Sequence, residues 1–173
     1  IPYTKYPAEL FQADRWVFLS KDVEQVFEKM RHSETVHLDK VAKVTVGLQT
    51  SWDDFYMFRP LGEDKFLYTF EFETKVYKIE KEICRPCLWD AKIEPFGEII
   101  PNACLIFPYV IEEENAMVIP EEIMSNKYPL AWKYFNDYKQ RLLKRNINGK
   151  NPKWYQYGRS QGITTIGKYN KLI

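Results

Sequence analysis

Histidine, cysteine and long apolar runs are scarce in this sequence, and each shortage excludes a class of function. With two histidines, His32 and His37, in 173 residues, no Ser/His/Asp or Cys/His catalytic triad is credible. Three cysteines are an odd number and make no disulfide framework, which favours a reducing cytoplasm. No apolar run approaches the roughly 20 residues that span a bilayer, and the start lacks the regions of a signal peptide. We therefore expect a cytoplasmic protein with no membrane partner.

Glycine-rich phosphate-binding motifs are also missing. The seven glycines form neither a Gly-x-Gly-x-x-Gly turn nor a P-loop. Residues 151–154, Asn-Pro-Lys-Trp, are similar to the Asn-Pro-Pro-Tyr motif with which adenine methyltransferases bind a flipped base, but Lys153 replaces its second proline. No glycine-rich turn for S-adenosylmethionine precedes these residues. We therefore predict no catalytic residue, no metal and no cofactor in this chain. Because it starts at Ile1 without a methionine, we expect a fragment of a longer protein.

The charge distribution is strongly asymmetric although the net charge is +1. Residues 127–173 contain eleven lysines and arginines against one acid, Asp137, and the preceding residues carry the acidic excess. Basic charge mixed with aromatic rings suits nucleic acid, since cations neutralise phosphates and rings stack on bases. A solvated helix above core aromatics is the alternative interpretation. The aromatic residues in this stretch are Tyr128, Trp132, Tyr134, Phe135, Tyr138, Trp154, Tyr155, Tyr157 and Tyr169.

The apolar patterning predicts an α+β fold in a single domain over residues 1–173, with 1–14 as a lead-in segment. A helix is expected over 20–31, with Ser20 as N-cap and Val23, Val26, Phe27 and Met30 packed in the core. A long basic helix is expected over 128–145, with proline at its first position. Between these flanking helices we expect a broken mixed or antiparallel sheet, with residues 48–54 as a loop. Its strand candidates are residues 41–46, 55–58, 65–72, 74–80 and 104–111.

Two motifs suggest other activities. Asp64 followed by Glu73-Thr74-Lys75 is similar to the acid and Glu-x-Lys arrangement with which nucleases hold magnesium, if Glu73 and Lys75 share a strand face. A free-standing metal-dependent nuclease is therefore the alternative function. Cys84-Arg85-Pro86-Cys87 has the spacing of a redox or zinc site, but neither a long helix nor a second ligand pair accompanies it. Two ordinary cysteines beside a turn are the simpler interpretation.

Several segments, in order, resemble one family. Residues 46–56, Val-Gly-Leu-Gln-Thr-Ser-Trp-Asp-Asp-Phe-Tyr, resemble the stretch that opens the target-recognition (specificity) domain of Taq-type adenine-N6 DNA methyltransferases, which also occurs in single-chain type IIG restriction enzymes. Residues 83–93 are similar to a later segment of that domain. The departures are Ser51, where the family often has glycine, and Cys84 and Cys87, where it has leucine or similar. Further similar segments are residues 16–20, 38–41, 105–109, 128–135 and 154–161.

This resemblance implies sequence-specific binding of double-stranded DNA, with catalysis in a separate N-terminal methyltransferase domain of the same parent chain. That domain would hold S-adenosylmethionine, and the parent enzyme could also carry an endonuclease. A duplex must be held while the target adenine leaves the stack, so backbone contacts and base contacts are both needed. Arginine and glutamine side chains suit bidentate contacts to guanine and adenine, and Lys153 suits a phosphate. The predicted DNA-binding residues are Gln49, Thr50, Ser51, Lys153, Trp154, Tyr155, Arg159 and Gln161.

Overall fold

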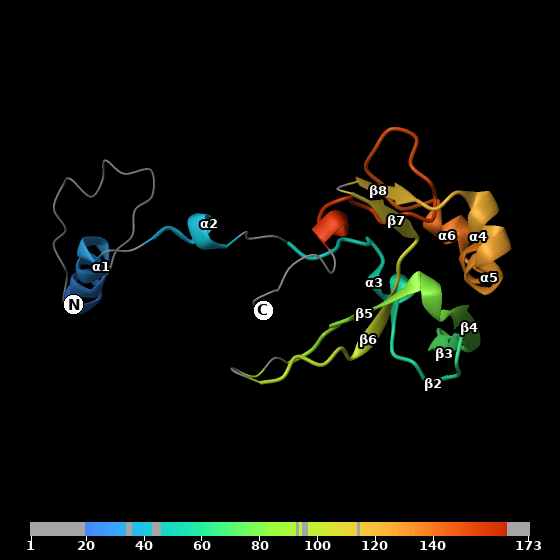
Figure 1. Ribbon diagram of the computed structural model, residues 1–173, viewed down its shortest axis with the longest axis horizontal. Helices are drawn as coiled ribbons and strands as arrows, with labels where there is room; N and C mark the ends of the chain where they lie inside the picture. The colour runs from blue at the N-terminus through green and yellow to red at the C-terminus, as the bar shows by residue number, and fades with distance from the viewer. Residues whose placement is uncertain are drawn as a thin grey trace, which may run out of the picture. The chain divides into compact units, whose positions relative to one another are not determined.

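The computed structural model describes residues 20–33, 36–42, 46–92, 94, 97–113 and 115–165 (Figure 1). Its contacts divide the chain into two units, Ile1–Val44 and Thr45–Ile173. The first unit contains two described helices and the second contains every described strand. The predicted α+β class is confirmed, because helices and small antiparallel sheets follow one another along the chain.

The first unit contains α1 (Lys21–His32) and α2 (Leu38–Val41). The helix predicted from Ser20 is confirmed, with extended backbone at Ser20 but no hydrogen bond from its hydroxyl. The predicted core stripe on this helix is wrong. Val23, Val26, Phe27 and Met30 are between 41% and 55% exposed. The stripe is apolar at helical spacing, but α2, the other described element of this unit, buries no residue.

The strand predicted over residues 41–46 is wrong at its start, because Val41 is the last residue of α2. The helical hydrogen bonding extends to Ala42, whose N–H donates to the Leu38 carbonyl at 2.8 Å. Residues 43–45 lie outside the described residues. The interpretation of 1–14 as a lead-in segment also lies outside them.

The second unit contains three small sheets in which every described pairing is antiparallel. One has the order β1-β6-β5, a second has the order β2-β3-β4, and the third is the β7–β8 hairpin (Figure 1). The predicted strands over 65–72 and 74–80 correspond to β3 and β4, which are rich in aromatic and β-branched residues. The strands are β1 (Met57–Phe58), β2 (Gly62–Glu63), β3 (Leu67–Phe72), β4 (Lys75–Glu80), β5 (Cys84–Cys87), β6 (Ala103–Ile106), β7 (Tyr109–Glu112) and β8 (Asn115–Val118).

Two strand predictions need correction. Phe55 and Tyr56 belong to a helical turn, α3 (Asp53–Tyr56), which lets both aromatic rings enter the core before β1 begins. The strand predicted over 104–111 is two strands, β6 and β7, which pair in different sheets. Pro108 lies between them, and a residue without an N–H interrupts a ladder of hydrogen bonds.

The predicted long helix over residues 128–145 is interrupted. It comprises α5 (Pro129–Asp137) and α6 (Lys139–Leu142), separated at Tyr138, whose φ of −115° and ψ of 12° depart from helical values. Proline at the first position of α5 is as predicted. A preceding helix, α4 (Glu121–Lys127), and two short 3-10 turns, Lys81–Ile83 and Ile163–Thr165, complete the elements.

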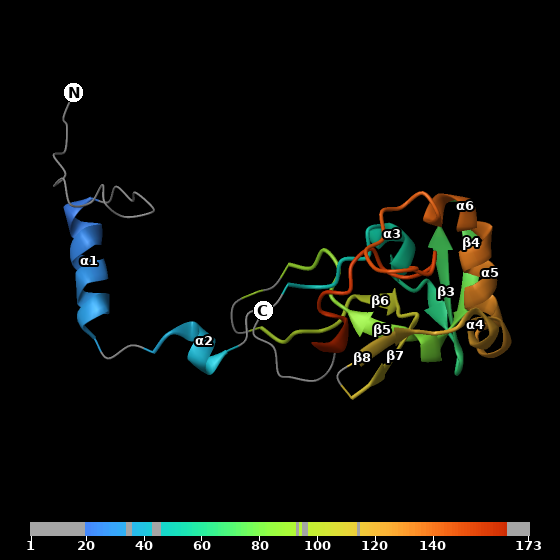
Figure 2. The ribbon, with the colours of Figure 1, turned by 90° about the horizontal axis from the view of Figure 1, so that it is seen from above.

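A carboxylate from the neighbouring sheet caps the start of α5. The Glu80 side chain accepts hydrogen bonds from the backbone N–H of Leu130 at 2.8 Å and of Ala131 at 3.0 Å. These donors have no partner inside the helix, and a negative charge suits the positive end of the helix dipole. Figure 2 shows α5 alongside β3 and β4, the arrangement that this cap fixes.

The core of the second unit is built largely from aromatic rings. Phe55 stacks on Tyr134 with ring centroids 4.5 Å apart, and Phe70 stacks on Phe58 at 4.2 Å. Buried tyrosine hydroxyls donate to backbone carbonyls, so each ring also fixes a chain segment. These bonds are Tyr56 Oη to Tyr155 O (3.0 Å), Tyr134 Oη to Phe55 O (2.9 Å), Tyr155 Oη to Ile119 O (2.6 Å) and Tyr157 Oη to Ile106 O (2.6 Å).

Candidate nucleic-acid interface

Two segments that are about a hundred residues apart in the sequence lie side by side, and we call residues 49–51 and 158–161 the paired loops. The Gly158 N–H donates to the Thr50 carbonyl at 3.0 Å, and the Arg159 N–H donates to the Gln49 carbonyl at 3.2 Å. A Cβ added at Gly158 would lie 1.7 Å from the Ser51 Oγ, so this close approach requires glycine. The two separately predicted sets of DNA-binding residues therefore meet.

Ser51 has a φ of 64°, which lies in the left-handed region that glycine favours. The Ser51 side chain is exposed beside Gly158. The turn therefore places a hydroxyl at the junction of the paired loops.

The paired loops expose polar side chains. Arg159 and Gln161 are exposed, Gln49 is half-buried, and Lys153 is exposed in the preceding turn. The side chains of Arg159, Gln161 and Lys153 make no hydrogen bond or ion pair with the part of the chain that the structure describes. They are therefore available to a partner. These are the types of side chain that read base edges or contact phosphates.

Thr50 has a structural role. Its side chain is completely buried, its hydroxyl donates to the Asp53 carboxylate at 2.5 Å, and it accepts the Trp52 N–H at 3.1 Å. This is the local bonding with which threonine stabilises the start of a helical turn, here α3. Base contact by the Thr50 side chain would require this arrangement to open.

Trp154 and Tyr155 are also structural. Trp154 is 8% exposed, and its indole N–H donates to Glu121 at 3.2 Å. Tyr155 is completely buried, and burial raises the pKa of its hydroxyl to about 12, so it stays a donor to the Ile119 carbonyl. Both rings pack in the aromatic core, so neither is presented to a base in this structure.

Arg145 organises the paired loops. It is the last residue of the long basic helix that the sequence predicts over 128–145. Its guanidinium donates to the Thr50 carbonyl at 2.9 Å, the Trp154 carbonyl at 3.0 Å and the Gln156 carbonyl at 2.8 Å. It also lies over the Tyr56 ring, 5.1 Å from the centroid. One side chain therefore joins the first loop, at Thr50, to the turn that precedes the second loop, at Trp154 and Gln156. Nothing in the local sequence distinguishes Arg145 from the neighbouring Lys144, which is exposed.

The basic surplus of residues 127–173 is only partly neutralised. Lys127 forms an ion pair with Glu82, and Arg141 forms one with Glu73. The aromatic residues of this stretch are mostly buried, so the alternative interpretation of core aromatics holds for them. Tyr169 lies outside the described residues. Exposed cations without an ion pair in the described residues are Lys133, Lys144, Lys150, Lys153 and Arg159.

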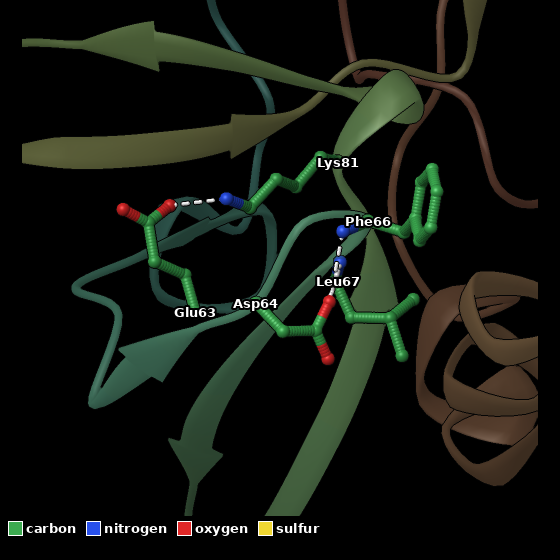
Figure 3. Close-up of polar contacts among 5 residues, drawn as sticks. All are labelled: Glu63, Asp64, Phe66, Leu67 and Lys81. Atoms are coloured by element: carbon green, nitrogen blue, oxygen red, sulfur yellow. Dashed lines mark hydrogen bonds and ion pairs between the residues drawn. The ribbon is translucent and has the colours of Figure 1, made fainter.

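The nuclease alternative fails on geometry. Asp64 precedes β3 and Glu73 follows it, so this six-residue strand separates them by about 20 Å. Asp64 accepts the N–H groups of Phe66 and Leu67, both at 2.8 Å, and these bonds lower the pKa of its carboxyl (Figure 3). Glu73 has a φ of 56° in the turn before Lys75 and pairs with Arg141, so the predicted shared strand face is wrong.

The two cysteines of residues 84–87 are the first and last residues of β5, which directly follows the 3-10 turn Lys81–Ile83. Because they are three residues apart in β5, Cys84 and Cys87 point to opposite faces of the sheet. Burial raises the pKa of both thiols, that of Cys87 to about 11, which opposes the thiolate that redox or metal chemistry needs. No group of three metal-ligating side chains occurs among the described residues.

A comparison with known proteins finds similarity to a restriction–modification enzyme. The chain is 29% identical, over 184 aligned residues, to the type II restriction enzyme and methyltransferase RM.Eco57I of Escherichia coli. The alignment includes 97% of this chain, which spans only 18% of the length of that enzyme. No family model matches the chain, and no solved structure matches it. None of the described helices has the length and apolar character needed to cross a membrane.

Proposed function

We propose that this chain is the target-recognition part of an adenine-N6 DNA methyltransferase of a restriction–modification system, and that it binds double-stranded DNA. The observation that carries this proposal is the meeting of the paired loops, which exposes arginine and glutamine side chains on a buried framework. Similarity to one segment of a restriction enzyme and methyltransferase supports it. Arg159 suits a guanine, Gln49 and Gln161 suit an adenine, and Lys153 suits a phosphate.

Methyl transfer is assigned to a separate N-terminal domain of the parent chain. The residues here do not fit S-adenosylmethionine or a flipped adenine, because residues 151–154 place Trp154 in the core with its indole engaged by Glu121. The role of this chain is to hold the duplex and select its sequence while the target base leaves the stack. Any endonuclease activity would also belong to the parent protein.

The first test is the gene sequence upstream of Ile1. We expect it to encode a glycine-rich motif for S-adenosylmethionine followed by Asn-Pro-Pro-Tyr or Asn-Pro-Pro-Phe. An acid and Glu-x-Lys motif further upstream would add a nuclease. A chain that starts near Ile1 would remove the methyltransferase assignment and leave an independent DNA-binding module.

The second test is selection of duplexes from a randomised pool, followed by titration of variants. Arg159→Ala and Gln161→Ala are each expected to relax preference at one base pair, by about 1–3 kcal/mol. Lys153→Ala is expected to weaken binding to all duplexes alike and to reduce the salt slope by about 0.9. Lys65→Ala, an exposed lysine between β2 and β3, is the control. Selection of no consensus by the unsubstituted chain and by its parent would contradict sequence recognition.

A further inference from the structure

A groove of about 470 Å³ lies between β4 and α5. Lys75 and Lys78 line it from the strand, and Lys133 lines it from the helix. All three lysines are exposed, and none of their side chains forms a hydrogen bond or ion pair within the described part of the chain. The acid in the groove wall is Asp137, which accepts the Tyr77 hydroxyl at 3.2 Å. The groove therefore has an excess of positive charge.

These lysines differ from those of the adjoining surface. Lys81, just beyond β4, pairs with Glu63 at 2.5 Å (Figure 3). Lys127, just before α5, pairs with Glu82. Lysine on an edge strand commonly prevents pairing with another sheet, and β4 is an edge strand. That explanation does not extend to Lys133, which lies on the helix. Cations converging from two elements indicate an anionic partner instead.

The groove leads toward the paired loops. Lys133, Asp137 and Arg141 follow one another at four-residue spacing, and Arg141 lies over the Trp52 ring, 4.3 Å from its centroid. Trp52 follows Ser51 directly in the sequence. Arg141 therefore contacts the residue that directly follows the exposed turn at Ser51.

We propose that this groove binds the phosphodiester backbone of the duplex whose bases the paired loops contact. The inference rests on the proposed DNA binding and adds a second contact surface to it. Lys75 and Lys78 are three residues apart in β4, so their side chains leave opposite faces of this edge strand, about 10 Å apart along it. From the two sides of the edge, these flexible side chains reach separate phosphates of one backbone. Val76 and Leu130 also line the groove and give it apolar surface, which suits the methylene stems of lysine side chains whose ammonium groups contact phosphates.

The test is the salt dependence of binding to a duplex of mixed sequence, with the full chain. Each phosphate contact contributes about 0.9 to the slope of the logarithm of affinity against the logarithm of salt concentration. We expect Lys75→Gln, Lys78→Gln and Lys133→Gln combined to reduce the slope by about 2.7 and to weaken binding at least tenfold at low salt. The preferred sequence should not change. The matched control combines Lys29→Gln, Lys65→Gln and Lys92→Gln, which remove the same charge at exposed positions elsewhere.

The outcomes separate this inference from the function on which it rests. If the unsubstituted chain binds and the groove variant keeps the same slope, the groove proposal is wrong and the paired loops stand. If the control loses as much slope as the groove variant, net charge explains the effect and the groove proposal is again wrong. If the unsubstituted chain binds no duplex at any salt concentration, both the proposed function and the groove contact are overturned.

Discussion

Arg145 is the residue on which the geometry of the paired loops most depends. Its guanidinium donates to the Thr50 carbonyl in the first loop and to the Trp154 and Gln156 carbonyls just before the second, and each hydrogen bond to a charged group contributes about 1.5–3 kcal/mol. We expect Arg145→Ala to lower the free energy of unfolding by about 2–4 kcal/mol, measured by urea denaturation with an unchanged m-value. Lys144→Ala should change it by less than about 0.5 kcal/mol. Equal effects of the two substitutions would contradict this role.

Gly158 and Ser51 form a pair whose substitutions should compensate each other. Gly158→Ala places a methyl group 1.7 Å from the Ser51 Oγ, and overpacking of this kind costs about 1–3 kcal/mol. Ser51→Gly removes the obstructing atoms and suits the φ of 64°, so it should restore most of that loss in the double variant. Thermal unfolding of the four proteins measures the coupling. Purely additive effects would show that the loops do not approach as described.

The reactivity of the Cys87 thiol tests whether β5 could carry redox chemistry. Burial raises the pKa of its thiol to about 11, so the thiolate forms only as the pH rises toward that value. At pH 8 we expect alkylation by iodoacetamide to be on the order of 100-fold slower in the folded protein than in urea, where the pKa returns to about 8.5. A Cys87→Ser variant identifies the modified position. Rapid alkylation of the folded protein at pH 8 would contradict the raised pKa and would support a redox role for Cys87.

Among the elements, α5 depends on a cap that is distant in sequence. Glu80→Gln should lower the free energy of unfolding by about 1 kcal/mol, because the amide offers one acceptor and no charge to the helix start. Glu71→Gln, on the exposed side of β3, is the matched control and should have little effect. Equilibrium urea titration of both variants measures the two free energies of unfolding. The cap is contradicted if both variants unfold at the same urea concentration as the parent.

The sequence predicted those elements whose signals are local. The start of α1, the strands β3 and β4, and proline at the first position of α5 follow from spacing and residue preference. It failed where tertiary contacts decide the backbone. Phe55 joins a helical turn because its ring stacks on Tyr134, a residue far along the chain. Tyr138 interrupts the last helix while its ring stays in the aromatic core, which no local pattern records.

For the candidate site, the sequence could indicate the exposed polar residues but not the contacts that hold their loops together. Arg159, Gln161 and Ser51 could be chosen as polar residues of loops in resembling segments, and the structure leaves them exposed. The adjacency of those loops could not be predicted, because it depends on backbone bonds between residues about a hundred apart. The burial of Trp154 and Tyr155 could not be predicted either, because an aromatic residue beside basic charge has the same sequence pattern whether it is buried or exposed.

At the scale of the molecule, the second unit holds the whole described core. All buried apolar side chains of that core lie between residues 55 and 163. We therefore expect residues 45–173 to fold without the first unit and to unfold cooperatively, within about 1 kcal/mol of the full chain. Urea denaturation followed by tryptophan fluorescence and by circular dichroism tests this. Transitions that no longer coincide in the shorter chain would show that the first unit contributes to the core.

The bonds that hold the paired loops end mostly on carbonyl oxygens. Arg145, Tyr56 and the N–H groups of Gly158 and Arg159 all donate to main-chain oxygens, and every residue type carries one. The exposed loop side chains can thus be exchanged during evolution or by an engineer without loss of the bonds that shape the loops, provided that position 158 remains glycine and position 50 keeps its hydroxyl. Under the proposed function, single substitutions at Gln49, Arg159 or Gln161 would then give new sequence preferences.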